Sequence, residues 1–174
     1  MRWAVAASLL LALPLWRQVK FKPEADRIQV EIDGKHYTTF CLALGENKPY
    51  VYPLSTASGM VVTRHFPMET FPGETNDHPH HRGMFFAHGD LNGYNFWATE
   101  LGTNSAKAGR MVLKKVLEAK GGPKSGTVSA MFTAEGPKGE PLMSETRTIT
   151  YSDSRLRTID YEARMDAIDK IVFK

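Results

Sequence analysis

The residues most capable of chemistry are concentrated in one segment, residues 74–97, which reads ETNDHPHHRGMFFAHGDLNGYNFW. Four of the six histidines fall within eleven residues of it: His78, His80, His81 and His88. An imidazole can transfer protons near neutral pH, ligate a metal or bind polar ligands. A single histidine is more often a packed side chain bonded to backbone. Here, however, four histidines lie close together among an arginine, carboxylates and glycines. This clustering predicts a functional site.

Metal binding is the first chemistry that the segment could support. Pro79 fixes its own backbone and disfavours the α region for His78, so we expect an extended loop here. In an extended chain His78 and His80 project to the same side. With His88 or Asp90 they would form a three-ligand site, and such ligands suit Zn, Fe or Cu.

Acid–base chemistry and polar recognition are the other two possibilities. A histidine held by Asp77 or Glu74 could titrate near neutral pH and transfer a proton. A sugar could instead be bound through its hydroxyls, with its ring against a flat aromatic side chain. The candidates for that binding are the histidines, Arg82, Asp90 and Asn92, with Trp97, Tyr94 or Phe96 as the aromatic.

A charged pair farther along the chain is a further candidate. In a strand over residues 142–151, the period of two places Glu145 and Arg147 on the face that carries Met143, Ile149 and Tyr151. The pair could line a pocket, with Glu145 as a base. It could equally be a surface ion pair on an exposed sheet.

Strands and hairpins are predicted throughout the rest of the chain. Alternating or β-branched patterns indicate strands at 27–32, 35–42, 50–54, 60–65, 127–134, 142–151 and 155–165. Asp33-Gly34 predicts a tight hairpin turn. Residues 110–118 fit a helix or a strand, and the neighbouring strands favour the strand. With no repeat or linker, residues 19–174 are expected to form one all-β domain, an antiparallel sandwich or barrel.

Composition limits the classes of function. The net charge is +3 with no block of Lys or Arg, which argues against nucleic-acid binding. Cys41 is the single cysteine, so Cys-based zinc and iron–sulfur clusters are excluded. Residues 1–18 form an apolar leader whose thirteen-residue run, Ala4–Trp16, is short of the roughly twenty needed to span a bilayer. It suits a secretory signal, although small residues are missing where cleavage would occur. We therefore expect an exported protein, periplasmic or extracellular, and not an integral membrane protein.

The string DHPHHRGMFFAHGDLNGYNFW closely resembles the hallmark of the bacterial PmoA-like family, whose members are often called methane oxygenase PmoA. The resemblance runs from about Arg27 to Lys174 and includes the stretches SETRTITY and RTIDYEA. It breaks off where family members usually continue, so we expect a truncated member. Methane oxidation by a membrane enzyme does not fit a mean hydropathy of −0.33 and one short apolar run.

The resemblance implies an exported β-sandwich similar to the galactose-mutarotase supersandwich, in which sugars bind on a concave sheet. By that analogy His80 or His81 is the acid, Glu145 the base and Arg82 a clamp for hydroxyls, with Arg147 beside them. No mutarotase motif matches residue by residue, so these roles are hypotheses.

The leading prediction is an exported protein that binds or modifies a carbohydrate, with a small molecule or oligosaccharide as ligand. Epimerase, lyase and hydrolase chemistry all remain open. One alternative is a metal-dependent oxidoreductase that uses His78, His80 and His88. The other is a non-catalytic sugar-binding module.

Overall fold

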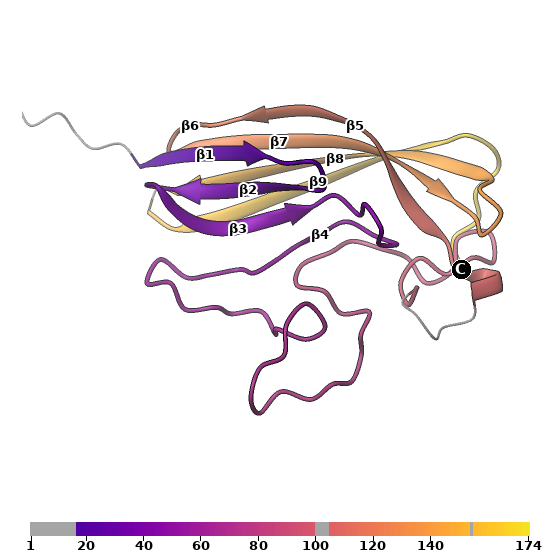
Figure 1. Cartoon of the computed structure of the whole chain (residues 1–174). Coiled ribbons are helices and arrows are strands. Elements are labelled where there is room, and N and C mark those ends of the chain that lie inside the picture. Colours follow the sequence, from indigo (N-terminus) through magenta and orange to yellow (C-terminus); the bar gives the residue numbers. More distant parts are fainter. Residues whose placement is uncertain (1–16, 100–104, 154) are drawn as a thin grey trace, which may run out of the picture.

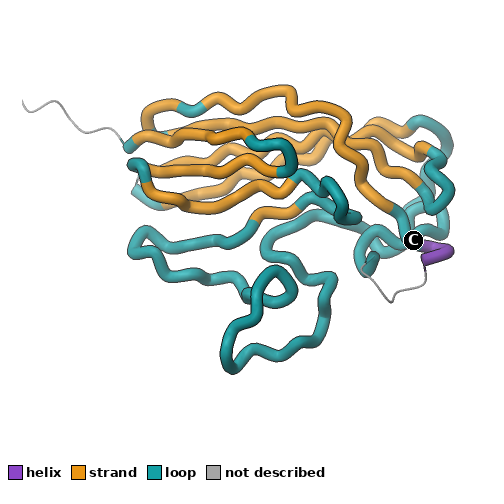
Figure 2. The backbone as a smooth tube through the Cα atoms, in the orientation of Figure 1, coloured by secondary structure: helices purple, strands orange, loops and turns teal. Residues whose placement is uncertain are grey.

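The computed structural model describes residues 17–99, 105–153 and 155–174, and its regular structure is nearly all β (Figures 1 and 2). The strands are β1 (Gln18–Pro23), β2 (Arg27–Ile32), β3 (Lys35–Cys41), β4 (Tyr50–Val51), β5 (Arg110–Lys120), β6 (Gly122–Pro123), β7 (Ser125–Glu135), β8 (Pro141–Asp153) and β9 (Arg157–Ala167). A short 3-10 turn, η1 (Ser105–Lys107), is the helical element within these ranges. The leader expected over residues 1–18 lies, up to residue 16, outside the described residues.

The strands form two antiparallel sheets that face each other (Figure 1). One sheet has the order β4-β3-β2-β1-β6, and the other has the order β5-β7-β8-β9. The predicted Asp33-Gly34 hairpin joins β2 to β3, and both turn residues have positive φ, 54° and 73°. Such a turn matches the right-handed twist of its strands. The prediction of an all-β antiparallel sandwich is confirmed.

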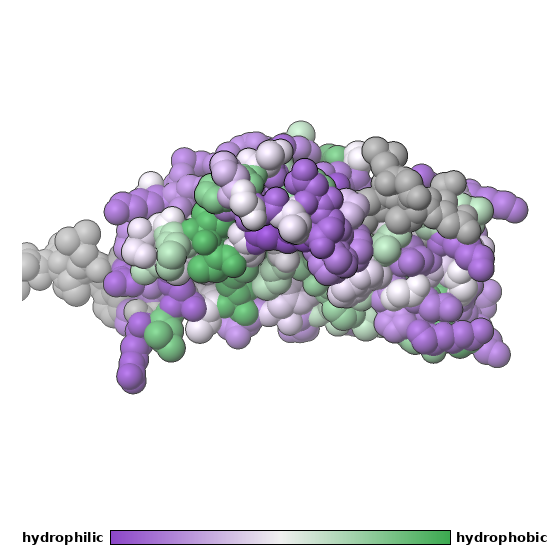
Figure 3. Space-filling view, turned by 90° about the horizontal axis from the view of Figure 1, so that it is seen from below, coloured by the Kyte–Doolittle hydropathy of each residue, from purple (hydrophilic) through white to green (hydrophobic). Residues whose placement is uncertain are grey.

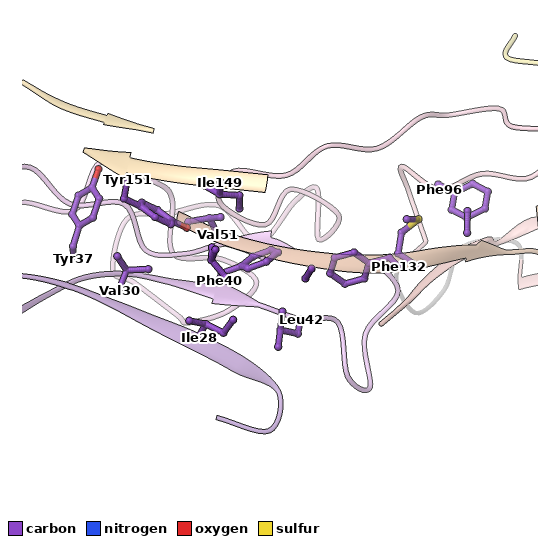
Figure 4. Packing of buried hydrophobic residues seen from close by; sticks show 14 of the residues in the cluster. Ile28, Val30, Tyr37, Phe40, Leu42, Val51, Phe96, Phe132, Ile149 and Tyr151 are labelled. Atoms are coloured by element: carbon purple, nitrogen blue, oxygen red, sulfur yellow. The ribbon is translucent and has the colours of Figure 1, made fainter. Parts of the chain in front are cut away.

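The core lies between the sheets and is built by the alternation of apolar residues along the strands. Ile28, Val30 and Ile32 of β2 are all fully buried or nearly so. Aromatic rings cross the interface: Phe40 and Phe132 lie 6.4 Å apart between ring centroids (Figure 4). Burial of each such side chain contributes about 1.5–3 kcal/mol to the free energy of folding, so this core stabilises the packing of the two sheets.

Some elements differ from the sequence-based expectations. Residues 110–120 are a strand, as the neighbouring strands suggested. The expected strand at 60–65 is wrong, because that stretch has only an isolated bridge between Ser55 and Val61. β1 was not predicted, and it pairs with β2 as a further strand of the first sheet.

Residues 52–99 form long loops that lie below the first sheet in Figure 2. A backbone bridge attaches them to the edge strand β4, with Val51 N donating to Met84 O at 2.8 Å and Met84 N to Val51 O at 3.0 Å. Figure 3 views this loop layer from below and shows apolar side chains among polar ones. Within the described ranges, no helix has the length and apolarity that crossing a bilayer requires.

Candidate functional site

The three histidines of the HPHH sequence gather their rings at a turn. His81 N donates to His78 O at 3.0 Å, and His78 adopts a left-handed φ of 50°. The expected extended loop is therefore wrong at this point, because the turn bond overrides the preference that Pro79 imposes on the preceding residue. The ring centroid of His78 lies 5.6 Å from that of His80 and 5.1 Å from that of His81. The ring of His81 thus lies in one cluster with those of His78 and His80.

Trp97 joins this histidine cluster at an open hollow. Its ring lies 6.4 Å from that of His80 and 6.0 Å from that of His81. The hollow has a volume of about 360 Å³ and is lined by Thr63, Arg64, His81, Gly83, Phe85 and Trp97. We call it the Trp97 hollow. It combines the exposed ring of Trp97 and the imidazole of His81, both predicted for polar recognition, with the guanidinium of Arg64 in place of the expected Arg82.

A buried lysine fixes the aromatic wall of the Trp97 hollow. Lys48 is 1% exposed, and its ammonium donates a hydrogen bond to the backbone carbonyl of Trp97. The same ammonium lies 4.6 Å from the ring centroid of Phe85, close enough for a cation–π contact. Phe85 in turn packs against Trp97 with 5.1 Å between centroids. Sequence reasoning missed Lys48, since an isolated lysine in a loop has no pattern that marks it as buried.

Two carboxylates hold histidines: Asp77 contacts His78 of the segment, as expected, whereas Glu74 contacts His65, which lies outside it. Asp77 lies 2.8 Å from Nδ1 of His78 and accepts a hydrogen bond from Thr75 at 2.7 Å. The Thr75 hydroxyl first, and then His78, lower the pKa of Asp77 to about 2, so the carboxylate is ionised at neutral pH. Glu74 lies 2.8 Å from Nδ1 of His65, which stood alone in the sequence.

Arg82 lines a second cavity and is not part of the lining of the Trp97 hollow. Its guanidinium forms an ion pair with Glu46 at 2.8 Å and lies 5.6 Å from the ring centroid of Tyr50. The cavity has a volume of about 540 Å³, and its lining includes Arg82, Glu46, Tyr50, Tyr52 and Glu69. We call it the Arg82 cavity. Its walls come from β3, β4 and the loops, a combination that sequence spacing does not predict.

Glu145 and Arg147 do not lie at the Trp97 hollow. Both side chains are almost completely buried and form an ion pair with each other, which excludes the exposed surface pair. Arg147 also donates to the carbonyl oxygens of Pro49 at 3.2 Å and Phe86 at 3.1 Å. The pair does border a pocket, but one with room for only about 20 Å³, roughly one water molecule. Its geometry is that of an anchor for the loops.

His88, Asp90 and Asn92 belong to a different turn. His88 packs against Phe173 with 5.1 Å between centroids, and its Nδ1 lies 3.1 Å from Asp90 O. Asp90 accepts a hydrogen bond from Gly93 N at 2.8 Å. Asn92 donates to Lys170 O at 2.9 Å and accepts from Val172 N at 2.8 Å, so it holds the C-terminal segment. These contacts are structural.

The predicted metal set of His78, His80 and His88 is not assembled. Across the described ranges, no group of three or more His, Cys, Asp or Glu side chains is arranged to hold a metal ion. The physical reason is that His88 lies on a separate turn with its own backbone and aromatic contacts.

Comparison with known proteins gives a family and nothing further. No curated protein and no solved structure matches the chain significantly. The resemblance to the PmoA-like family and to galactose mutarotases therefore stays a prediction. The family model that matches covers residues 27–174, which include every strand except β1 and every loop residue discussed above. The chain belongs to this family, described as the family of unknown function DUF6807.

Proposed function

We propose that the Trp97 hollow binds an uncharged carbohydrate, in an exported protein whose site is the histidine cluster. The observation that carries the proposal is the meeting of Trp97, Phe85 and His81 around one open hollow of about 360 Å³. This volume lies within the roughly 300–1,000 Å³ typical of small-molecule sites. The occupant would be about the size of one sugar ring with part of a second.

The lining matches the two surfaces of a sugar. A pyranose ring has apolar C–H faces, which pack on an aromatic ring, and hydroxyls at its edge, which donate and accept hydrogen bonds. Trp97 is 41% exposed, so its indole is accessible for such packing. Neutral imidazole offers a donor at one nitrogen and an acceptor at the other, and Arg64 adds further donors.

Acid–base chemistry on the bound sugar would depend on the histidines. His81 lines the hollow, and His80 lies 4.3 Å from it between ring centroids. Asp77 orients His78 beside them through its 2.8 Å contact. Glu145 is enclosed with Arg147, so a base at this hollow would have to be one of the imidazoles or Asp77. Binding is the function that we propose, with His80 and His81 as the candidates for proton transfer.

Calorimetric titration with a panel of uncharged mono- and disaccharides tests the proposal. The wild-type protein should bind at least one of them, and Trp97→Ala should weaken that binding about tenfold, equivalent to about 1.4 kcal/mol. Phe71→Ala, which removes another exposed aromatic ring outside the hollow, is the matched control and should bind as the wild type does. A panel without any binding, or a Trp97→Ala variant with unchanged affinity, would contradict the proposal.

Turnover separates an enzyme from a binding module. The bound sugar is incubated with the protein and followed by proton NMR for a change of anomer, epimer or linkage. If the sugar changes, His81→Ala should abolish that change. If it remains intact, His81→Ala should only weaken binding, and the protein acts as a module.

A further inference from the structure

The Arg82 cavity is a hollow of about 540 Å³ outside the proposed site. Its polar groups come from several parts of the fold: Thr39 of β3, Tyr50 of β4, Tyr52 just after it, and Glu69 and Arg82 of the loops. A cavity bordered by one rigid sheet edge is well suited to hold a ligand in a fixed orientation.

The charges around the Arg82 cavity are balanced, which disfavours an anionic ligand. The guanidinium of Arg82 is paired with Glu46 at 2.8 Å, and that of Arg27 with Asp26 at 2.6 Å. Glu69 is an exposed carboxylate in the lining and would repel a phosphate or an acidic sugar. The polar groups that remain suit a ligand with hydroxyls.

Two tyrosines, Tyr50 and Tyr52, line this cavity with neutral phenols. Burial first, and then the charge of Glu69, raise the pKa of Tyr52 to about 12. Burial also raises the pKa of Tyr50 above its ordinary range. Both phenols therefore stay protonated at physiological pH. The Tyr50 hydroxyl donates to Glu46 at 3.4 Å, whereas the buried Tyr52 hydroxyl makes no hydrogen bond with the described residues.

The Arg82 cavity and the Trp97 hollow share one wall. His81 lines the hollow and the next residue, Arg82, lines the cavity. Gly83 of the hollow lies directly against Tyr52 of the cavity, since a Cβ placed on this glycine would be 3.1 Å from Tyr52 Cβ. The segment 63–69 borders both, with Arg64 on one side and Glu69 on the other. The two hollows are therefore separated by little more than the thickness of a chain.

We infer that the Arg82 cavity is a second sugar subsite, so that the natural ligand is an uncharged oligosaccharide of at least two units and not a monosaccharide. This inference rests on the proposed function of the Trp97 hollow and extends it. One unit packs on Trp97, and the following unit reaches past the shared wall to the hydroxyls and charged groups around Tyr52 and Glu69.

The dependence of affinity on chain length tests the inference. Calorimetry gives the dissociation constants of the best-binding monosaccharide and of its linear di-, tri- and tetrasaccharides for the full chain. The affinity of the wild-type protein should rise about tenfold or more between one unit and three. Glu69→Ala and Tyr52→Phe should each reduce this gain at least about threefold. Glu69 is exposed and phenylalanine retains the ring of Tyr52, so both variants should fold.

Glu118→Ala, which changes an exposed glutamate on β5, is the control and should retain the full gain. If the monosaccharide binds but affinity does not rise with chain length, the second subsite is refuted while the proposed function stands. An unchanged gain in both Glu69→Ala and Tyr52→Phe refutes it as well. If no saccharide of any length binds, both proposals fail together.

Discussion

Arg147→Ala is the substitution whose effect on stability follows most directly from the structure. Arg147 is 1% exposed and is the buried partner of Glu145. Its guanidinium also bonds two backbone carbonyls, at Pro49 beside β4 and at Phe86 in the loop layer. One side chain thus connects β8 to two segments that lead into the proposed site. We expect Arg147→Ala to destabilise the whole domain.

The magnitude follows from what the substitution leaves behind. Removing one partner of a buried ion pair typically costs about 3–5 kcal/mol, because the other charge stays buried without compensation. Here the other charge is Glu145, whose side chain is 2% exposed. The loss of the hydrogen bonds to the two carbonyls does not simply add to the cost of breaking the ion pair, because the same side chain makes both. We therefore expect Arg147→Ala to lower the free energy of unfolding by about 4 kcal/mol in total. This is a large share of the roughly 5–15 kcal/mol that stabilises a typical domain.

Urea unfolding followed by circular dichroism measures the free energy of unfolding of the wild type and of Arg147→Ala. The control is Arg110→Ala, which removes an exposed guanidinium from its pair with Glu135 and should cost less than about 1 kcal/mol. The double variant Glu145→Leu/Arg147→Met should recover much of the loss, since an apolar pair leaves no isolated charge. A cost below about 1 kcal/mol for Arg147→Ala would refute this account of the anchor.

Two further predictions concern the loop layer. Gly83→Ala should destabilise the protein by at least about 2 kcal/mol in the same urea assay, because the added Cβ would lie 2.3 Å from Val51 O at a φ of 57°. Gly93→Ala, also at positive φ but with open space around it, should cost only about 1 kcal/mol, and equal costs would count against the close packing. By carboxyl NMR, the pKa of Asp77 should be about 2, below its usual 3.8. Its contribution to stability is then complete above pH 3.8 and lost as the pH falls through about 2. Thr75→Val should raise this pKa and move the loss to higher pH, and an unchanged titration would exclude the hydroxyl as its main cause.

The sheets could be predicted from the sequence because their signals are local. Apolar alternation over 27–32 and 142–151 fixed which residues face the core, and Asp33-Gly34 fixed a hairpin. The strand at 60–65 was wrong for a reason that is not local. A β-branched run becomes a strand only where a neighbouring strand offers free backbone groups, and the sheet edge at β4 ends with Val51.

The candidate site could be predicted only in part. The histidines and Trp97 could be grouped because they are close in sequence, and the structure brings His78, His80 and His81 together with Trp97. The period of two along residues 142–151 placed Glu145 on the correct face of its sheet. It could not show that the loops cover this part of the face. The contact of Lys48 with residues some fifty positions away depends on the folded loops and has no trace in local sequence.

The thiol of Cys41 can be used to detect whether the Arg82 cavity is occupied. It is the single thiol of the sequence, it is partly accessible, and it lies in the lining of the Arg82 cavity. Burial raises the pKa of this thiol, so alkylation by a maleimide should be slow at neutral pH and faster in alkaline buffer. Any molecule that occupies the cavity would shield the sulfur. The rate of alkylation, followed by mass spectrometry, would then register occupancy at this one location without an engineered label.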